Sequence, residues 1–269
     1  MADPPAPSVP QFYLEGEPHL PPERMVEAFC KIFGVQRDQL GIKPVVVASF
    51  FNHLTSYLAT QAKAERSPYR ISGRIDNELY ILNDTVSLTT LRMGAPAAVM
   101  DCEELIACGA KTLIIVGAAG SLQPDLPIGS VTLPTAAIRE EGTSHHYLPP
   151  ELPATATPEL VAALHEACMQ AGLETRTGLH WTTDAPYREH KTKIDAYREA
   201  GVLSVDMEVS ALYVLAQHRG VACASVLAIS DELYEPWRIG FTDAGFLNAV
   251  TKIGAAAMET AQVVGADSA

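Results

Sequence analysis

Several features that mark other classes of protein are missing from this chain of 269 residues. It has no uninterrupted apolar run of about 18 residues, so the sequence predicts no transmembrane helix. The first ten residues, MADPPAPSVP, lack the basic start and apolar core of a signal peptide. The five cysteines form no CxxC pair, which favours reduced thiols and a cytoplasmic location. We therefore expect neither a disulfide framework nor a metal site.

Basic residues are also scarce. The chain has 19 Lys and Arg against 32 Asp and Glu, a net charge of −13 and a pI of about 5.0. This balance argues against nucleic acid or a membrane surface as a partner and leaves small molecules. The Pro-rich residues 1–16 are predicted to be a disordered lead-in, and residues 17–269 a single domain.

What the sequence does contain is a regular alternation of apolar strands and amphipathic helices. This pattern predicts the α/β class, as one three-layer sandwich with a central mixed, mostly parallel sheet flanked by helices. The expected strands are 43–50, 78–82, 86–91, 112–116, 130–138, 175–179, 202–205 and 222–229. The expected helices are 22–33, 52–64, 95–109, 158–172, 188–200, 207–216 and 242–264.

Three polar or glycine-rich stretches stand at the ends of predicted strands: 117–121, 206–208 and Asp231. Ligands of open α/β sheets bind at the carboxyl ends of the strands, so these stretches are predicted to converge on one site. Gly117-Ala118-Ala119-Gly120 is expected to be a turn that lets a ligand approach the backbone closely. It matches neither GxGxxG nor a P-loop, so a dinucleotide is not favoured.

Two carboxylates, Asp206 and Glu208, lie where an apolar strand becomes an apolar helix. A helix start stabilises an ionised carboxylate, which then accepts hydrogen bonds from ligand hydroxyls. Asp206 could equally be a helix cap, whereas a cap does not explain Glu208. Asp231 follows an apolar strand, where a raised pKa would suit a general acid, although a cap or turn role is the alternative. A diol-binding carboxylate and an acid together suit cleavage of an N-glycosidic bond.

Several motifs in order carry a resemblance to a known family. They are Gly94-Ala-Pro-Ala-Ala-Val with Glu103-Glu104-Leu105, VGAAGSLQPDLPIGSV (116–131), Glu141-Gly-Thr-Ser, Thr182-Thr-Asp-Ala-Pro-Tyr, VDMEVSAL (205–212) and AISDE (228–232). The chain resembles the nucleoside phosphorylase family, which includes uridine phosphorylase, hexameric purine nucleoside phosphorylase and methylthioadenosine-type nucleosidases. The resemblance runs from about Val86 to Asp231. The triplet Pro18-His19-Leu20 also resembles an N-terminal segment of the family.

The resemblance implies a role for each matching residue. Met207 would lie under the ribose, Glu208 would bind its 2′- and 3′-hydroxyls, and Asp206 replaces a Glu found in many members. Asp231 would protonate a purine base, while Ala118, Ala119 and Gly120 would border the ligand. Pro186 replaces an aromatic residue that stacks on the base, so Tyr187 or Trp181 would substitute for it. His19 would reach a neighbouring subunit's site, or would be an ordinary exposed histidine.

The phosphate site departs from the phosphorylases. Ile115 stands where they carry an Arg, Ala119 has no hydroxyl, and 50–54 (FFNHL) replaces their first glycine-rich loop. Losing these groups removes most charge-assisted bonds to phosphate. Hydrolysis is therefore favoured over phosphorolysis, with Asn52 or His53 as the nearest groups for orienting water. The cations that could rebuild a phosphate site, with phosphate as a co-substrate, are Arg66, Arg70 and Arg92.

Three readings of the function stay open. The first is hydrolytic release of a purine-like base, the second is phosphorolysis of a purine or uridine nucleoside, and the third is a nucleoside-binding module without turnover. No cofactor is expected. The resemblance also implies a homo-oligomer, either a dimer or a trimer of dimers. Elsewhere, Glu103 and Glu104 are expected on a solvated helix face, and His145 and His146 lack metal-ligand spacing.

Overall fold

The alternation of helices and strands expected from the sequence is present in the computed structural model, which describes residues 16–67, 78–234 and 236–267. The helices are α1 (Pro22–Phe33), α2 (Asn52–Gln61), α3 (Ala95–Ala107), α4 (Pro158–Gln170), α5 (Lys191–Glu199), α6 (Val209–Arg219) and α7 (Ala244–Asp267), with 3-10 turns η1 (Arg37–Leu40), η3 (Ser144–His146) and η4 (Pro186–Arg188). The strands are β1 (Val45–Ser49), β2 (Glu65–Arg66), β3 (Leu79–Ile81), β4 (Val86–Thr90), β5 (Thr112–Ser121), β6 (Val131–Glu140), β7 (Ala154–Thr155), β8 (Thr175–Thr183), β9 (Ser204–Asp206), β10 (Ala222–Glu232) and β11 (Arg238–Ile239).

The sheet is mixed, as predicted, but it is not the simple central layer of a sandwich. Parallel pairs join β4, β1, β5 and β10, and a second parallel set joins β6, β8 and β9. Antiparallel pairs between β10 and β6 and between β5 and β9 then connect the two sets. The order β5–β10–β6–β8–β9 therefore closes on itself as a barrel-like ring, which the alternation of elements could not reveal.

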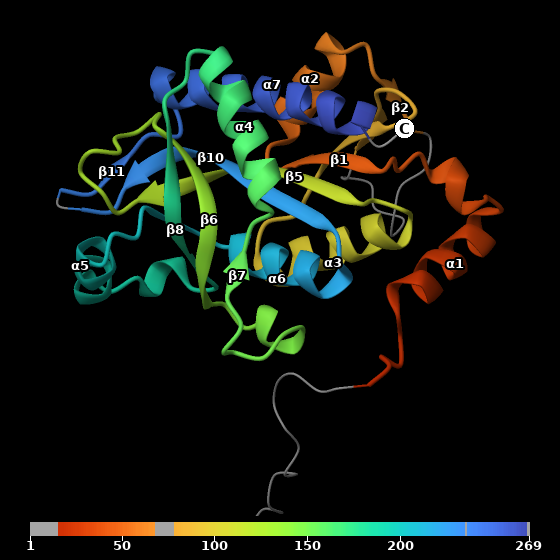
Figure 1. The fold of residues 1–269 in the computed structure, drawn as a ribbon, viewed down its shortest axis with the longest axis horizontal. Helices are drawn as coiled ribbons and strands as arrows, with labels where there is room; N and C mark the ends of the chain where they lie inside the picture. The colour runs from red at the N-terminus through yellow and green to blue at the C-terminus, as the bar shows by residue number, and fades with distance from the viewer. Residues whose placement is uncertain (1–15, 68–77, 235, 268–269) are drawn as a thin grey trace, which may run out of the picture.

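Helices pack outside this sheet and bury its strands. In Figure 1, α7 and α4 lie along one side of β10 and β5, while α3 and α6 lie along the other. Strand β1 is buried along its whole length, and helix α6 is buried at every position from Val209 to Ala216. A helix that is apolar on almost all sides fits such an enclosed position.

Local signals set several helix boundaries. Helix α1 begins at Pro22, because proline suits a first helical position, and ends before Gly34, whose φ of 66° is left-handed. Both ends agree with the expected range. By contrast, the helix expected from residue 188 begins at Lys191, after the short turn η4. The expected lead-in lies almost wholly outside the described residues.

None of the helices in the described part of the chain is long and apolar enough to cross a membrane. All five cysteines are free thiols, and Cys102, Cys168 and Cys223 among them are buried. Across residues 16–67, 78–234 and 236–267, no group of three His, Cys, Asp or Glu side chains is placed to hold a metal ion.

Candidate active site

The three predicted stretches meet at one cavity of about 740 Å³. Strand β5 lies between the other two, because Gly120 pairs with Val205 of β9 on one side and with Asp231 of β10 on the other. The prediction that these stretches converge is therefore confirmed. The cavity is lined by Phe50, Phe51, Met93, Ala118, Ala119, Gly120, Pro186, Tyr187, Glu189, Val205, Asp206, Met207, Glu208, Ser230, Asp231, Leu233, Trp237 and Phe241.

The glycine-rich stretch is not the turn that the sequence suggested. Residues 117–120 lie inside β5, which stays paired with β10 as far as Ser121. The two glycines instead make room. A Cβ on Gly120 would lie 2.8 Å from Leu233 Cδ1 and 3.3 Å from Asp231 Oδ2, and one on Gly117 would lie 3.3 Å from Phe50 Cδ2. These small residues leave the space that the cavity occupies.

Glu208 is held between the starts of two helices. It is the residue that precedes α6, rather than a member of its first turn, and only 6% of it is exposed. Its Oε1 accepts a 2.6 Å hydrogen bond from the N–H of Gly94, which precedes α3 with a φ of 92°. Burial raises the pKa of Glu208 above its usual value and the charge of Asp206 raises it further, whereas the N–H groups of Gly94 and Met207 lower it.

Asp206 borders the cavity but has several protein partners. Its Oδ1 accepts a 2.8 Å hydrogen bond from Thr182 Oγ1, and its Oδ2 accepts one of 2.9 Å from the N–H of Val209. The latter bond satisfies the first N–H of α6, although the N-cap position of the helix is Glu208 and not Asp206. The buried His180 Nε2 lies 2.9 Å from Oδ1, outside hydrogen-bond geometry, while its Nδ1 lies 2.9 Å from Ser204 Oγ. Asp206 is therefore part of a packed polar network behind the cavity.

Asp231 lies inside β10, so it is neither a helix cap nor a turn residue. Ser230 Oγ donates to its Oδ1 at 2.8 Å, and Trp237 Nε1 lies 3.4 Å from its Oδ2. Burial raises the pKa of Asp231, and these two donors oppose the rise. The carboxyl is thus fixed in direction and favours its protonated form more than an exposed Asp does.

Not every residue singled out from the sequence lies at the cavity. Trp181 is 1% exposed and donates its indole N–H to Glu140, in a separate apolar cluster. Asn52 and His53 begin α2 and are exposed, although the His53 ring packs 5.7 Å from Phe51. His19 is exposed, and its carbonyl accepts a hydrogen bond from Arg24. Of the predicted set, these four are absent from the cavity wall.

Other cavity residues escaped the sequence reasoning. Glu189 follows η4 and is half-buried, and burial together with the charge of Asp231 raises its pKa to about 7. Its only sequence signal was its position two residues after Tyr187, which is fully exposed at the cavity mouth. The remaining members of this group are the polar Ser230 and seven apolar or aromatic residues: Phe50, Phe51, Met93, Val205, Leu233, Trp237 and Phe241.

The cations proposed for a phosphate site have other partners. Arg92 donates to both carboxylate oxygens of Asp101, and Arg66 forms a 2.8 Å ion pair with Glu78. Arg70 lies outside the described residues. Ile115 is fully buried within β5. Within the described ranges, no Lys, Arg or His side chain lines the cavity.

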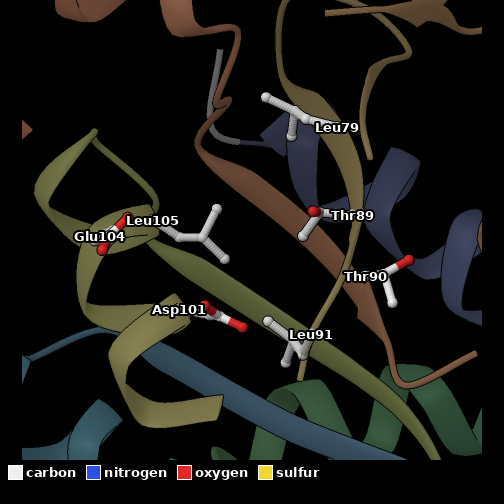
Figure 2. Close-up of a pocket in the computed structure, with 7 residues that line it drawn as sticks. All are labelled: Leu79, Thr89, Thr90, Leu91, Asp101, Glu104 and Leu105. Carbon is white, nitrogen blue, oxygen red and sulfur yellow. The ribbon is translucent and has the colours of Figure 1, made fainter. Parts of the chain in front are cut away.

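Acidic residues of α3 are buried, which corrects the expectation of a solvated face. Glu103 is 8% exposed and Glu104 is 4% exposed, and Arg219 of α6 forms a two-point ion pair with Glu103. Asp101 and Glu104 also border a second cavity of only about 20 Å³, together with Thr89 and other residues of β3, β4 and α3 (Figure 2). That volume suits a single water molecule and excludes a nucleoside.

The same fold occurs in a solved nucleoside phosphorylase. A crystal structure of purine nucleoside phosphorylase from Toxoplasma gondii, in complex with immucillin-H, superposes with a TM-score of 0.77. The alignment covers 85% of this chain and 94% of that one, at 24% identity, which establishes a common fold.

Sequence comparison gives the family. The model of the phosphorylase superfamily matches residues 55–264, so the chain belongs to that superfamily. A uridine phosphorylase from Thermococcus kodakarensis is 34% identical over 157 residues, which cover 54% of this chain and 57% of the relative. A DeoD-type purine nucleoside phosphorylase from Bacillus cereus is 34% identical over 151 residues, which cover 55% and 64% respectively. The chain thus spans less than two thirds of the length of these relatives.

Proposed function

We propose that the protein cleaves the N-glycosidic bond of a purine-like nucleoside and releases the free base. The observation that carries this proposal is the meeting of Glu208, Met207 and Asp231 in one cavity at the ends of β9 and β10. These are the residues to which the family resemblance gives the roles of hydroxyl acceptor, ribose support and general acid.

The contacts of each carboxyl suit its proposed role. Burial raises the pKa of Asp231, which makes it the candidate to donate a proton to the base as the bond to C1′ breaks. Glu208 is held by the Gly94 N–H on one oxygen, and it would accept hydrogen bonds from the ribose hydroxyls. Nearby carboxylate charge would also stabilise the oxocarbenium character that develops on the sugar. Met207 and the small residues of β5 would border the ribose, and Tyr187 and Pro186 lie at the mouth.

For the nucleophile, we favour water. The cavity wall holds four carboxyl groups, those of Asp206, Glu208, Glu189 and Asp231, and no cation from the described ranges. Phosphate would have to enter this acidic space without a guanidinium or ammonium partner, and an unpaired buried anion carries a large desolvation cost. Water carries no charge. We assign no step to Asn52 or His53, because neither lines the cavity.

Phosphorolysis is the second candidate, and it is favoured by the names of the relatives, which are uridine, guanosine and purine nucleoside phosphorylases. The test is product analysis with a nucleoside panel in phosphate-free buffer and in the same buffer with added phosphate. Equal rates of base release, with free ribose as the sugar product, support hydrolysis. Ribose 1-phosphate formed only with phosphate supports phosphorolysis instead. Binding without base release in either buffer would leave the third reading, a binding module.

The oligomeric state, the cellular location and the lack of a cofactor are also proposals. We infer a homo-oligomer, a dimer or a trimer of dimers, acting in the cytoplasm on a small-molecule nucleoside without a cofactor. Sedimentation of the purified protein tests the oligomeric state directly.

A further inference from the structure

The indole of Trp237 lies against the carboxyl group that the proposed function makes the acid of the reaction. Trp237 and Asp231 both line the large cavity. The indole Nε1 lies 3.4 Å from Asp231 Oδ2, while Ser230 Oγ donates to Oδ1 at 2.8 Å. Oδ2 also lies beside the cavity wall, since a Cβ on Gly120 would be 3.3 Å from it. Trp237 therefore donates to the carboxyl oxygen on the cavity side.

The position of this indole is set by the hairpin that joins β10 to β11, which lie side by side at one edge of the sheet (Figure 1). The paired residues are Asp231 with Ile239 and Glu232 with Arg238. Trp237 therefore immediately precedes the paired part of β11. The Arg238 guanidinium also forms an ion pair of 3.1 Å with Glu232, of which only 2% is exposed. Backbone pairing and an ion pair together hold the segment that carries the indole.

The chemistry of the indole suits one state of the acid. An indole nitrogen donates a hydrogen bond and cannot accept one, and its bond is stronger when the acceptor is ionised. Asp231 becomes ionised during the proposed reaction. As the bond from C1′ to the base breaks, its electron pair goes to the base and the base takes the proton of Asp231, which later regains a proton from solvent. The indole N–H is thus directed at an oxygen where negative charge develops in the transition state.

We propose that Trp237 is a positioning residue for the candidate acid: it orients Oδ2 of Asp231 and stabilises the carboxylate that proton transfer leaves behind. This inference rests on the proposed function, because it takes Asp231 as the acid of the leaving base. It adds a role for a residue outside the family motifs. The other tryptophan has no such role, because Trp181 is buried away from the cavity and donates its N–H to Glu140.

The kinetic test uses Trp237→Phe, which keeps an aromatic ring and removes the N–H. With a purine nucleoside, kcat and kcat/KM should both fall by about 10- to 150-fold while KM stays nearly unchanged, because the lost bond strengthens only as the charge develops. With p-nitrophenyl riboside, whose leaving group needs no proton, the loss should be much smaller. Equal losses with both substrates, or wild-type kinetics with the purine nucleoside, would overturn the proposal. Trp181→Phe removes the other indole N–H and should keep the wild-type ratio between the two substrates.

The pH profile gives a second readout. The Trp237 N–H lowers the pKa of Asp231 against the larger, raising effect of burial. Activity needs the protonated acid and falls as the pH rises through that pKa, so Trp237→Phe should move the basic limb of the kcat/KM profile to higher pH. An unmoved limb, or a limb moved to lower pH, contradicts the proposal. The other titratable side chains of the cavity wall and the hairpin are Asp206, Tyr187, Glu189, Glu208, Glu232 and Arg238, and they are unchanged in the variant.

A third measurement does not depend on turnover. The chain has two tryptophans, and a carboxyl group beside an indole quenches its emission more when protonated than when ionised. The emission of the wild type should therefore change with pH, with a midpoint above about 3.9, the ordinary aspartate pKa. The change should be absent from Trp237→Phe and from Asp231→Asn. A flat wild-type profile, or a titration that persists in either variant, refutes the contact. A titration without base release from any nucleoside refutes the proposed function instead, so the two failures are distinguishable.

Discussion

Replacing Glu208 tests the proposed hydroxyl acceptor. Two variants are needed, because this carboxyl also accepts the 2.6 Å hydrogen bond from the Gly94 N–H. Glu208→Ala removes the acceptor for the ribose and for Gly94 together. Glu208→Gln keeps the shape and an amide oxygen for Gly94, and removes only the charge. The pair of variants therefore separates the contribution to catalysis from the contribution to the fold.

The magnitudes follow from the contacts. A hydrogen bond to a charged group contributes about 1.5–3 kcal/mol, so Glu208→Ala should lower kcat/KM by about 10- to 150-fold before any extra loss in the transition state. It also leaves the buried Gly94 N–H without its acceptor, which costs about 1–3 kcal/mol of folding stability. Because burial and the Asp206 charge raise the pKa of Glu208, the ionised form is disfavoured in the folded protein, and Glu208→Gln should keep or raise the Tm at pH 8.

The assay is steady-state base release from a nucleoside, together with thermal melts of each variant at pH 8. Glu199→Gln removes one surface carboxylate and controls for net charge. The reasoning would be refuted if Glu208→Gln melted like the wild type and kept its kcat/KM for the nucleoside. A variant that loses activity only because it unfolds would be recognised by its lower Tm.

Three further predictions use other parts of the cavity. Asp231→Asn should lower kcat/KM for a purine nucleoside by about 10²- to 10⁴-fold. The loss should be much smaller for p-nitrophenyl riboside, whose leaving group needs no proton. Equal losses with both substrates would indicate a structural role for Asp231 instead. Gly120→Ala should lower both the Tm and kcat/KM, because its Cβ would lie 2.8 Å from Leu233 Cδ1 and force a shifted rotamer costing about 0.5–1.5 kcal/mol; unchanged melting and kinetics would mean that the cavity floor adapts. Because the folded-state pKa of Glu189 is raised to about 7, its contribution to stability is full below the ordinary glutamate pKa and is lost as the pH rises through 7. Glu189→Gln should therefore raise the Tm at pH 8 and leave it nearly unchanged at pH 4.5, and a Tm gain equal at both pH values would contradict this cause.

The sequence predicted best what depends on local pattern and on the direction of strands. The long apolar run before Gly117 and the run before Asp231 indicate parallel buried strands, whose carboxyl ends must share an edge. This explains the predicted meeting of Asp231 with residues 117–121, whereas Asp206 and Glu208 join them through β9, which pairs antiparallel with the end of β5. The nearly all-apolar helix after Glu208 likewise indicated burial on every side.

The predictions that were wrong, and the features that were missed, share one physical origin. Each depends on contacts with residues that are distant in the sequence. Residues 117–120 continue β5 because β10 and β9 supply hydrogen-bond partners. The sequence of those four residues alone gives no indication of these partner strands. Glu103 is buried because Arg219, more than a hundred positions away, neutralises it. Closure of the sheet requires two antiparallel pairs between strands far apart in the chain. Glu189 occurs in a polar loop. Neither a hydrophobic periodicity nor a sequence motif distinguishes it there from other surface glutamates.

In the proposed function, the carboxyl groups of the cavity bear on the nucleophile as well as on base release. Two unit charges 4 Å apart interact by about 4 kcal/mol near a protein surface, so one ionised carboxylate at that distance from a phosphate dianion would already cost more than a typical hydrogen bond returns. Four carboxyls border this cavity, and two of the arginines considered for a phosphate site already have carboxylate partners, Arg92 with Asp101 and Arg66 with Glu78. A developing oxocarbenium ion carries the opposite charge and gains from the same carboxylates. A positive sugar and a neutral nucleophile are the combination that the proposed hydrolysis uses, and we expect free ribose rather than ribose 1-phosphate as the product.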